Sequence, residues 1–138
     1  MNCNNYTRIA HVCLWFGDKI ALSKRLKPGF HQNFWQDCGG KVEKGESILK
    51  AAQRETFEES SFYYPASYFE FIDCFLYEER RLKTFLFELK RDEGMFKNIK
   101  NPEPLKQSDW KLFTIEESLK LDRLMPSVRI HLENLERQ

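Results

Sequence analysis

The chain has 138 residues, of which 41% are hydrophobic and 14% aromatic, and its formal net charge is +1. This length and composition predict one globular domain over residues 1–138 with a packed core, and they exclude a disordered chain. Because the net charge is near zero, the chain as a whole has no electrostatic field that would attract it to nucleic acid or membranes. We therefore expect no membrane association and no stable nucleic-acid binding.

The cysteines and the N-terminal residues bear on the compartment. Cys3, Cys13, Cys38 and Cys74 stand well apart with no CxxC pair, which favours free thiols over disulfides or a zinc site. The first residues contain no apolar targeting segment, and no stretch approaches the roughly 20 apolar residues of a membrane span. These patterns predict a cytoplasmic protein.

The first third of the chain reads as three strands. Residues 6–16 and 19–25 are rich in β-branched and aromatic residues and are separated by a Gly-Asp turn, which predicts a β-hairpin. Residues 26–33 contain proline and glycine and predict a loop. Residues 34–38 predict a short strand.

The segment 39–62 predicts a tight glycine turn followed by a helix. Ser47 lies where a helix N-cap is expected, and no proline interrupts the run to Ser61. An apolar stripe starts on one face of this helix and continues into acidic residues: Ile48, Ala51, Ala52, Glu55, Glu58 and Glu59. The spacing therefore predicts that three carboxylates converge on a face that points inward.

Like charges at this spacing repel, and they repel more strongly when they are desolvated. A cation is needed to neutralise them, and carboxylate oxygens are hard ligands that suit Mg²⁺, or Mn²⁺ as a second choice. The alternative is an acidic, solvated helix surface.

The second half of the chain adds strands and two helices. Residues 68–77 and 82–90 predict a long hairpin, 91–107 a mobile loop, and 109–113 a last short strand. Thr114 and Glu117 form a capping box that opens a short helix, and Pro126 begins a terminal amphipathic helix whose apolar face could serve a homodimer. Strands and helices interleave without a regular βαβ repeat, which predicts an α+β fold with a mixed sheet.

The acidic segment fits a known signature. The pattern G-x5-E-x7-R-E-x-x-E-E matches Gly40, Glu46, Arg54, Glu55, Glu58 and Glu59 without a gap, and it resembles the Nudix hydrolases. Thr56 stands where an aliphatic residue is commoner, and Ser61 replaces the glycine that usually ends the helix. The resemblance implies an α/β/α sandwich with a central mixed sheet, in which the signature forms a loop-helix-loop.

The resemblance also implies a chemistry, namely attack of water on a pyrophosphate that links a nucleoside to another group. By position, Glu55, Glu58, Glu59 and the Gly39 carbonyl are the expected metal ligands. Arg54 would orient these carboxylates, and Glu46 would brace the loop against Arg54. The general base differs among relatives; Glu103 is one candidate, and a solvent-facing loop glutamate is its alternative.

The flanks of the signature bear on the substrate. The W-x-x-x-G-G sequence from Trp35 to Gly40 resembles MutT-like nucleoside triphosphate pyrophosphatases, so we expect Mg²⁺-dependent conversion of a (d)NTP to a (d)NMP and pyrophosphate. Gln36 would read the base or pair within the sheet, Trp35 would stack or belong to the core, and Arg25 would bind phosphate or be solvated. Ser127 and the valine after it stand where relatives that favour oxidised guanine have aspartates, so activity on 8-oxo-dGTP is not assumed.

Three other functions remain open. Tyr77 lies at a distance beyond the signature that is common in dinucleoside polyphosphate hydrolases, and an RNA-cap hydrolase is a further alternative. A non-catalytic nucleotide-binding protein on the same fold usually lacks signature glutamates, and this chain has all of them.

Overall fold

The computed structural model describes residues 6–138, so Cys3 lies outside the described part of the chain. The strands are β1 (Thr7–Phe16), β2 (Lys19–Lys24), β3 (Trp35–Gln36), β4 (Cys38–Lys41), β5 (Glu70–Tyr77), β6 (Leu82–Arg91) and β7 (Lys111–Phe113). The α-helices are α1 (Ile48–Ser60), α2 (Ile115–Leu119) and α3 (Pro126–Glu136), and short 3-10 helices are η2 (Ala66–Tyr68), η3 (Glu78–Arg80) and η4 (Glu93–Asn98).

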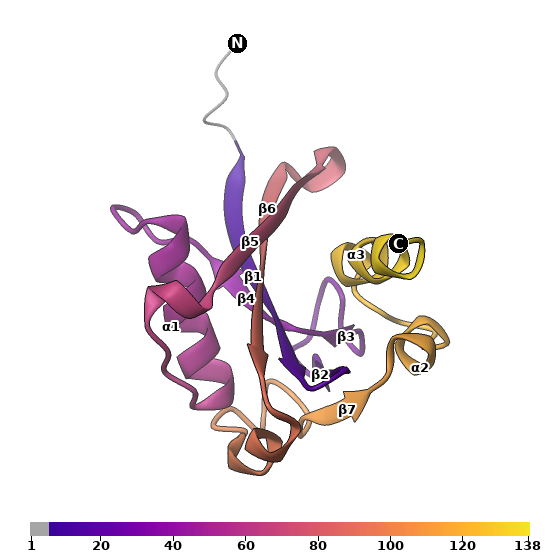
Figure 1. Ribbon diagram of the computed structural model, residues 1–138. Coiled ribbons are helices and arrows are strands. Elements are labelled where there is room, and N and C mark those ends of the chain that lie inside the picture. Colours follow the sequence, from indigo (N-terminus) through magenta and orange to yellow (C-terminus); the bar gives the residue numbers. More distant parts are fainter. Residues whose placement is uncertain (1–5) are drawn as a thin grey trace.

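Strand β1 is the centre of a seven-stranded mixed sheet (Figure 1). One edge of β1 pairs in parallel with β6 along all ten residues. Its other edge is shared, because the first half of β1 pairs with β4 and the second half with β2, both antiparallel. The two predicted hairpins, β1–β2 and β5–β6, are confirmed, and so is the mixed sheet.

Helices cover both faces of this sheet, which confirms the α/β/α sandwich (Figure 1). Alternate residues of β1 point to opposite layers, as strand geometry requires. Ala10, Val12 and Leu14 pack with buried residues of α1, whereas Cys13 and Trp15 pack with buried residues of α3. The sheet is therefore the wall between two apolar cores.

Helix α1 begins at the predicted N-cap, since the Ser47 side chain accepts a hydrogen bond from the amide of Lys50. Its buried face differs from the predicted stripe, because the apolar run continues into two small polar residues and not into the glutamates. Thr56 and Ser60 are fully buried, and their hydroxyls donate to backbone carbonyls one turn earlier. The glutamates consequently lie along the edge of the buried face.

Three local predictions were wrong in detail. The glycine pair at 39–40 is extended strand within β4 and not a turn, because it pairs with β1. The strand predicted at 34–38 is split into β3 and β4, which pair with different neighbours. The loop predicted to be mobile at 91–107 contains η4, whose Phe96 packs edge-to-face on Phe16 of the core.

The last two helices follow their predicted signals. The capping box of Thr114 and Glu117 is present at α2, and α3 begins at Pro126. The apolar face of α3 is buried against the chain's own sheet through Val128 and Leu132. This face of α3 is therefore not available to a second copy of the chain. A homodimer stays a prediction, and it would have to form through another surface.

Two further observations concern the sequence-based expectations on compartment. Within residues 6–138, no helix combines the length and the apolar character needed to cross a bilayer. Cys13, Cys38 and Cys74 carry free thiols.

Candidate functional site

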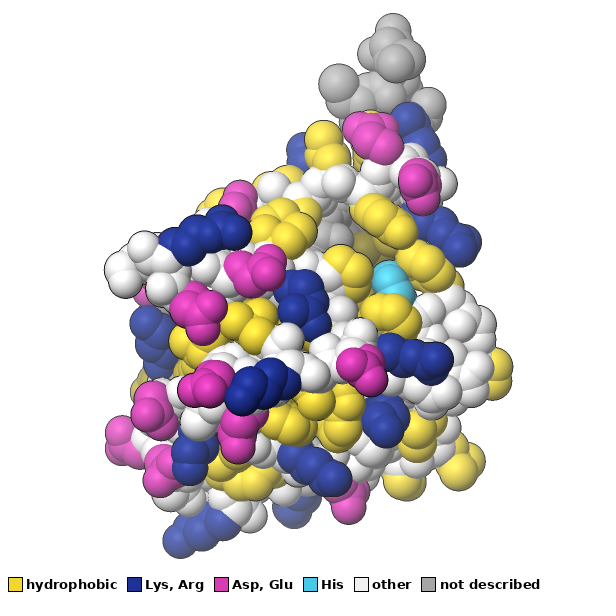
Figure 2. All heavy atoms as spheres, turned by 90° about the vertical axis from the view of Figure 1, so that its right-hand side faces the viewer, with side chains coloured by type: hydrophobic (Ala, Val, Ile, Leu, Met, Phe, Trp, Pro, Cys, Tyr) yellow, Lys and Arg dark blue, Asp and Glu magenta, His cyan; other side chains and the backbone are white. Residues whose placement is uncertain are grey.

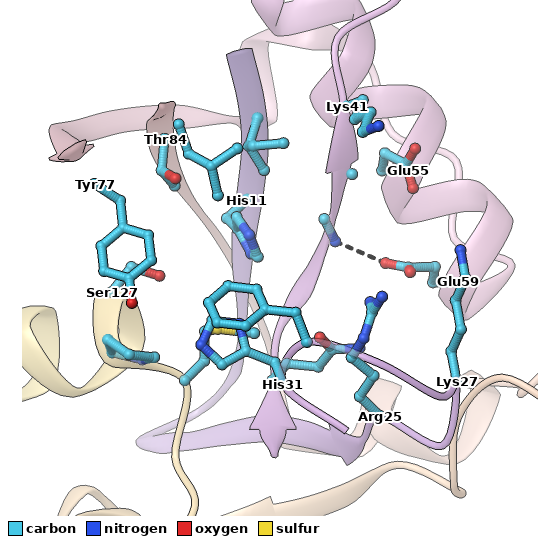
Figure 3. Close-up of a pocket in the computed structure, with 18 of the residues that line it drawn as sticks. His11, Arg25, Lys27, His31, Lys41, Glu55, Glu59, Tyr77, Thr84 and Ser127 are labelled. Carbon is cyan, nitrogen blue, oxygen red and sulfur yellow. Dashed lines mark hydrogen bonds between the residues drawn. The ribbon is translucent and has the colours of Figure 1, made fainter. Parts of the chain in front are cut away.

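A cavity of about 820 Å³ opens on the α3 side of the sheet. Its floor is formed by β1, β4 and β6, and its walls by the loop after β2, the carboxylates of α1, and the start of α3 (Figure 3). This volume is in the range of roughly 300–1,000 Å³ that is typical of small-molecule sites.

The signature residues form one end of this cavity. Glu55, Glu58 and Glu59 all line it, as does Gly39 of β4. Glu59 is the inner carboxylate: it accepts a hydrogen bond of 2.7 Å from the Gly39 amide (Figure 3). Glu58 lies further out and its side chain is 44% exposed.

Arg54 lies at the centre of the acidic cluster. Its guanidinium donates two hydrogen bonds to Glu46, at 2.8 and 3.0 Å, which is the bracing contact that the sequence predicts. It also contacts Glu55 at 2.8 Å, Glu58 at 3.1 Å and Glu43 at 3.1 Å. The hydrogen bond from Arg54 lowers the pKa of Glu46 to about 2, so Glu46 is a permanent anion at neutral pH.

The inner carboxylates have the opposite electrostatic character. Burial raises the pKa of Glu59 well above its ordinary value, against the Gly39 hydrogen bond, and the negative charges of Glu55 and Glu103 raise it further. Burial also raises the pKa of Glu55, although Arg54 acts in the other direction. Carboxylates destabilised in this way are those that a bound cation would stabilise.

Metal binding would require some rearrangement of these side chains. Among residues 6–138, no three acidic, histidine or cysteine side chains are placed so that they could hold one ion. Arg54 occupies the space between Glu55 and Glu58 instead. The donor set itself fits a hard cation, because the groups that face the cavity here are carboxylate oxygens.

The basic residues at the cavity lie on the loop after β2 and on neighbouring segments. Arg25 points into the cavity from the end of β2 (Figure 3), and its buried Nε has no hydrogen-bond partner among the described residues. Lys27 and Lys106 line the same space, and Lys106 is within 3.5 Å of Glu103. A guanidinium that faces a cavity and has a buried N–H without an acceptor is suited to bind an anion.

Aromatic side chains form the end opposite the carboxylates. The rings of Phe30 and Tyr77 stack with centroids 6.0 Å apart, and the Arg80 guanidinium lies over Phe30 at 3.9 Å. His31 contacts Phe30 at 3.8 Å and adopts a left-handed backbone conformation with φ of 65°. Such a platform suits a flat, apolar ligand group.

Of the four substrate-binding residues expected from the sequence, three line the cavity and one does not. Arg25, Gln36 and Glu103 all line the cavity. Trp35 does not belong to its lining; its ring packs edge-to-face on Phe113 at 5.2 Å, and Lys24 lies over it. Of its two alternatives, the geometry favours packing over stacking with a ligand.

Other cavity residues were not identified from the sequence, and His11 is the clearest example. Its Nδ1 lies 2.5 Å from Oδ1 of the fully buried Asp37. Burial lowers the pKa of His11, but the charge and hydrogen bond of Asp37 outweigh this and the pKa is raised. A lone histidine within an apolar strand has no motif; its only sequence signal is a polar residue at an otherwise buried position.

Comparison with known proteins identifies the same family that the acidic signature resembles. The chain matches the NUDIX domain over residues 6–135. A curated 8-oxo-dGTP diphosphatase of Buchnera aphidicola is 33% identical over 66 residues, which cover 47% of this chain and 52% of that protein. The matched segment thus spans about half the length of this relative.

Solved structures share the fold along nearly the whole chain. A MutT NUDIX hydrolase of Burkholderia pseudomallei superposes with a TM-score of 0.78 at 18% identity, covering 92% of this chain and 95% of that one. A C. elegans Ap4A hydrolase binary complex gives a TM-score of 0.67 at 19% identity, covering 94% and 96%. A bifunctional NMN adenylyltransferase/ADP ribose pyrophosphatase of Francisella tularensis, complexed with AMP and a Mn ion, gives 0.75 at 19%, covering 96% and 42%.

Proposed function

The chain belongs to the Nudix family of hydrolases, which act on nucleotide pyrophosphate linkages, and on that premise we propose that it is a Mg²⁺-dependent nucleoside triphosphate pyrophosphatase. It would convert a (d)NTP and water to a (d)NMP and pyrophosphate. Family membership makes it an enzyme of small nucleotide substrates, and Nudix hydrolases generally use divalent metals.

One observation carries the proposal: destabilised carboxylates and a guanidinium whose buried Nε has no hydrogen-bond partner within residues 6–138 face the same cavity. Glu55 and Glu59 lie at one end, and Arg25 points into the space beside them. A polyphosphate bound with divalent cations satisfies both, because the cations neutralise the carboxylates and the phosphate oxygens accept from the guanidinium.

The residues that would hold the metal are Glu55, Glu58, Glu59 and the carbonyl of Gly39. A bound divalent cation supplies charge neutralisation at the phosphate oxygens and lowers the pKa of a coordinated water. Arg54, anchored on Glu46, would hold the carboxylates in place.

The remaining parts of the cavity would position the substrate. Arg25 would bind phosphate and Gln36 would contact the base. Glu103, which lines the same cavity and whose charge raises the pKa of Glu55 and Glu59, is the candidate for a base that removes a proton from the attacking water. The exposed ring of Tyr77 would stack with the nucleobase.

A second candidate function is hydrolysis of dinucleoside polyphosphates. The observation in its favour is that Tyr77, which the sequence singled out for this class, lines the cavity and is 37% exposed. This exposed ring would stack with a second nucleoside.

The test is pyrophosphate release from a panel of nucleotides with Mg²⁺, including 8-oxo-dGTP and a dinucleoside tetraphosphate. We expect one or more (d)NTPs to be hydrolysed, and Glu59→Gln to lower turnover by roughly 10³-fold, because an amide is a poor ligand for a hard cation and carries no charge. Glu136→Gln, on the exposed end of α3, is the matched control and should leave turnover unchanged.

Two results would contradict the proposal. Retained activity in Glu59→Gln would defeat the site assignment, and an inactive wild type on every nucleotide would favour a non-catalytic nucleotide-binding protein. Preferential hydrolysis of the dinucleoside tetraphosphate would select the second candidate.

A further inference from the structure

Two polar side chains on the cavity floor have no protein partner for the atoms that face it. The Gln36 side chain lines the cavity, its residue is only 7% exposed, and it makes no side-chain hydrogen bond to any residue in 6–138. His11 uses Nδ1 to contact Asp37, and within the same residues its Nε2 has no hydrogen-bond partner. Both groups are largely enclosed by protein and open toward the cavity, so a ligand bound there can supply the hydrogen-bond partners that the protein does not.

The orientation of the His11 ring is fixed by its surroundings. Asp37 is 1% exposed and does not line the cavity; its second oxygen accepts from the Cys13 thiol at 3.6 Å. The face of the imidazole packs on Gly39, where a Cβ atom would come within 2.5–2.8 Å of the ring. Because Asp37 is buried and Gly39 is held within strand β4, the ring has little freedom to turn, and Asp37 acts as a positioning residue for His11.

The location of these two groups indicates which part of a nucleotide they meet. His11 lies in the middle of the floor, between the carboxylate end at Glu59 and the aromatic end at Tyr77 (Figure 3). Phosphate oxygens only accept hydrogen bonds, and Arg25 already serves them. A glutamine amide offers both a donor and an acceptor, which matches the mixed polar edge of a nucleobase.

We propose that His11, positioned by Asp37, is a specificity-determining residue that hydrogen-bonds the polar edge of the substrate's nucleobase together with Gln36. The inference rests on the proposed nucleotide substrate and adds to it the groups that select the base. Discrimination by such groups is strong because the wrong base leaves them buried and unpaired.

The test measures binding and not turnover. Dissociation constants of AMP, GMP, CMP, UMP and ribose 5-phosphate are measured by calorimetry without metal. The variants are the double replacement His11→Leu/Asp37→Leu, which removes the buried charge together with its partner so that the chain still folds, and Gln36→Leu.

For the wild type we expect the four monophosphates to differ by at least about tenfold in affinity. In the double variant this spread should fall to about threefold, with Gln36→Leu intermediate, while ribose 5-phosphate binds as before. The matched control is Glu88→Leu/His131→Leu, which removes a second buried acid–histidine pair that lies outside the cavity lining. It should keep the wild-type ranking of the bases.

Three outcomes would overturn the inference: a wild type that does not discriminate, a double variant that keeps the wild-type ranking, or an equal loss for ribose 5-phosphate. Because no hydrolysis is measured, the proposed function can fail separately. If no triphosphate is hydrolysed but base selectivity depends on His11, the inference holds and the pyrophosphatase assignment fails.

Discussion

Two glycines of β4 leave room for the two side chains that approach the backbone most closely. A Cβ atom at Gly39 would overlap the ring of His11, and one at Gly40 would overlap the carboxylate of Glu55. From the sequence, the Gly39 carbonyl is an expected metal ligand. The packing of His11 gives a separate physical reason for a residue without a Cβ atom at this position.

These two contacts predict different results for alanine substitutions. In Gly40→Ala the atoms nearest to the new methyl group belong to the flexible end of Glu55. We therefore expect a Tm close to wild type and a turnover lower by about 10²-fold, because the carboxylate is displaced. In Gly39→Ala the His11 ring cannot move away from Asp37, so the free energy of unfolding should fall by about 1–3 kcal/mol. Thermal unfolding and pyrophosphate release check both.

Comparing the two alanine variants tests how rigidly Glu55 and His11 are held. A Gly40→Ala protein that loses as much stability as Gly39→Ala would show that Glu55 is held as rigidly as His11. Equal turnover of Gly40→Ala and wild type would show that the position of Glu55 is not critical.

At the scale of the element, helix α1 ends at a serine whose backbone has a conformation that serine disfavours. Ser61 occupies the C-cap in the left-handed region, with φ of 66°, and its amide donates to the Phe57 carbonyl. Glycine adopts this conformation without the steric cost that a Cβ atom brings. The helix therefore retains the geometry of a glycine cap at some cost in stability.

Replacing Ser61 by glycine should relieve this strain. We expect Ser61→Gly to raise the free energy of unfolding by about 0.5–1 kcal/mol, the steric gain being partly offset by the greater entropy of the unfolded chain. Ser61→Ala keeps the Cβ atom and is the control, for which we expect no gain. Chemical denaturation measures both, and a stabilised Ser61→Ala together with an unchanged Ser61→Gly would refute the explanation.

The elements were largely predictable from the sequence because their signals are local. The caps at Ser47 and Thr114, the two hairpins and the start of α3 follow from residue types within a few positions. The strand character of Gly39 and Gly40 was missed because pairing with β1 imposes it, and glycine has no strand preference of its own. The position of His11 depends on Asp37, which is distant in sequence, so no spacing in the sequence could show it.

At the scale of the whole molecule, a buried polar network joins the α3 layer to the sheet. Glu88 of β6 accepts a hydrogen bond of 2.7 Å from Trp15 of β1, and the same carboxylate oxygen lies 2.7 Å from Nε2 of His131 of α3. The start of α3 lines the cavity through Ser127, whereas Glu88 and His131 do not line it. On the side of the described chain that Figure 2 shows, positive and negative side chains are interspersed and neither forms a broad continuous patch.

This network predicts a dependence of stability on pH. Burial acts to raise the pKa of Glu88, but the hydrogen bond and charge of His131 outweigh it, so the folded-state pKa lies below the ordinary value of 4.5. A depressed carboxyl pKa gives stability that is complete above the unfolded-state value and is lost as the pH falls through the folded-state value. The advantage of wild type over Glu88→Gln in free energy of unfolding should therefore be full at pH 6–7 (roughly two pH units above that value) and shrink below about pH 4.5.

Urea denaturation of the two proteins across this pH range measures the difference. Glu116→Gln, which removes an exposed carboxylate of α2, is the control and should show no such change. A constant difference between wild type and Glu88→Gln at all pH values would contradict the expected ionisation of Glu88.

The parallel pairing of β1 with β6 has a consequence for how the site is assembled. The two strands are far apart in the chain, and everything that carries the signature lies in the loop between them. Closing a loop of this length is entropically expensive and makes folding slow relative to helix formation. A peptide that ends at residue 62 would contain every signature glutamate, yet its first strand would lack the neighbour that completes the sheet. Transplanting this activity into another scaffold would accordingly require the whole segment from β1 through β6.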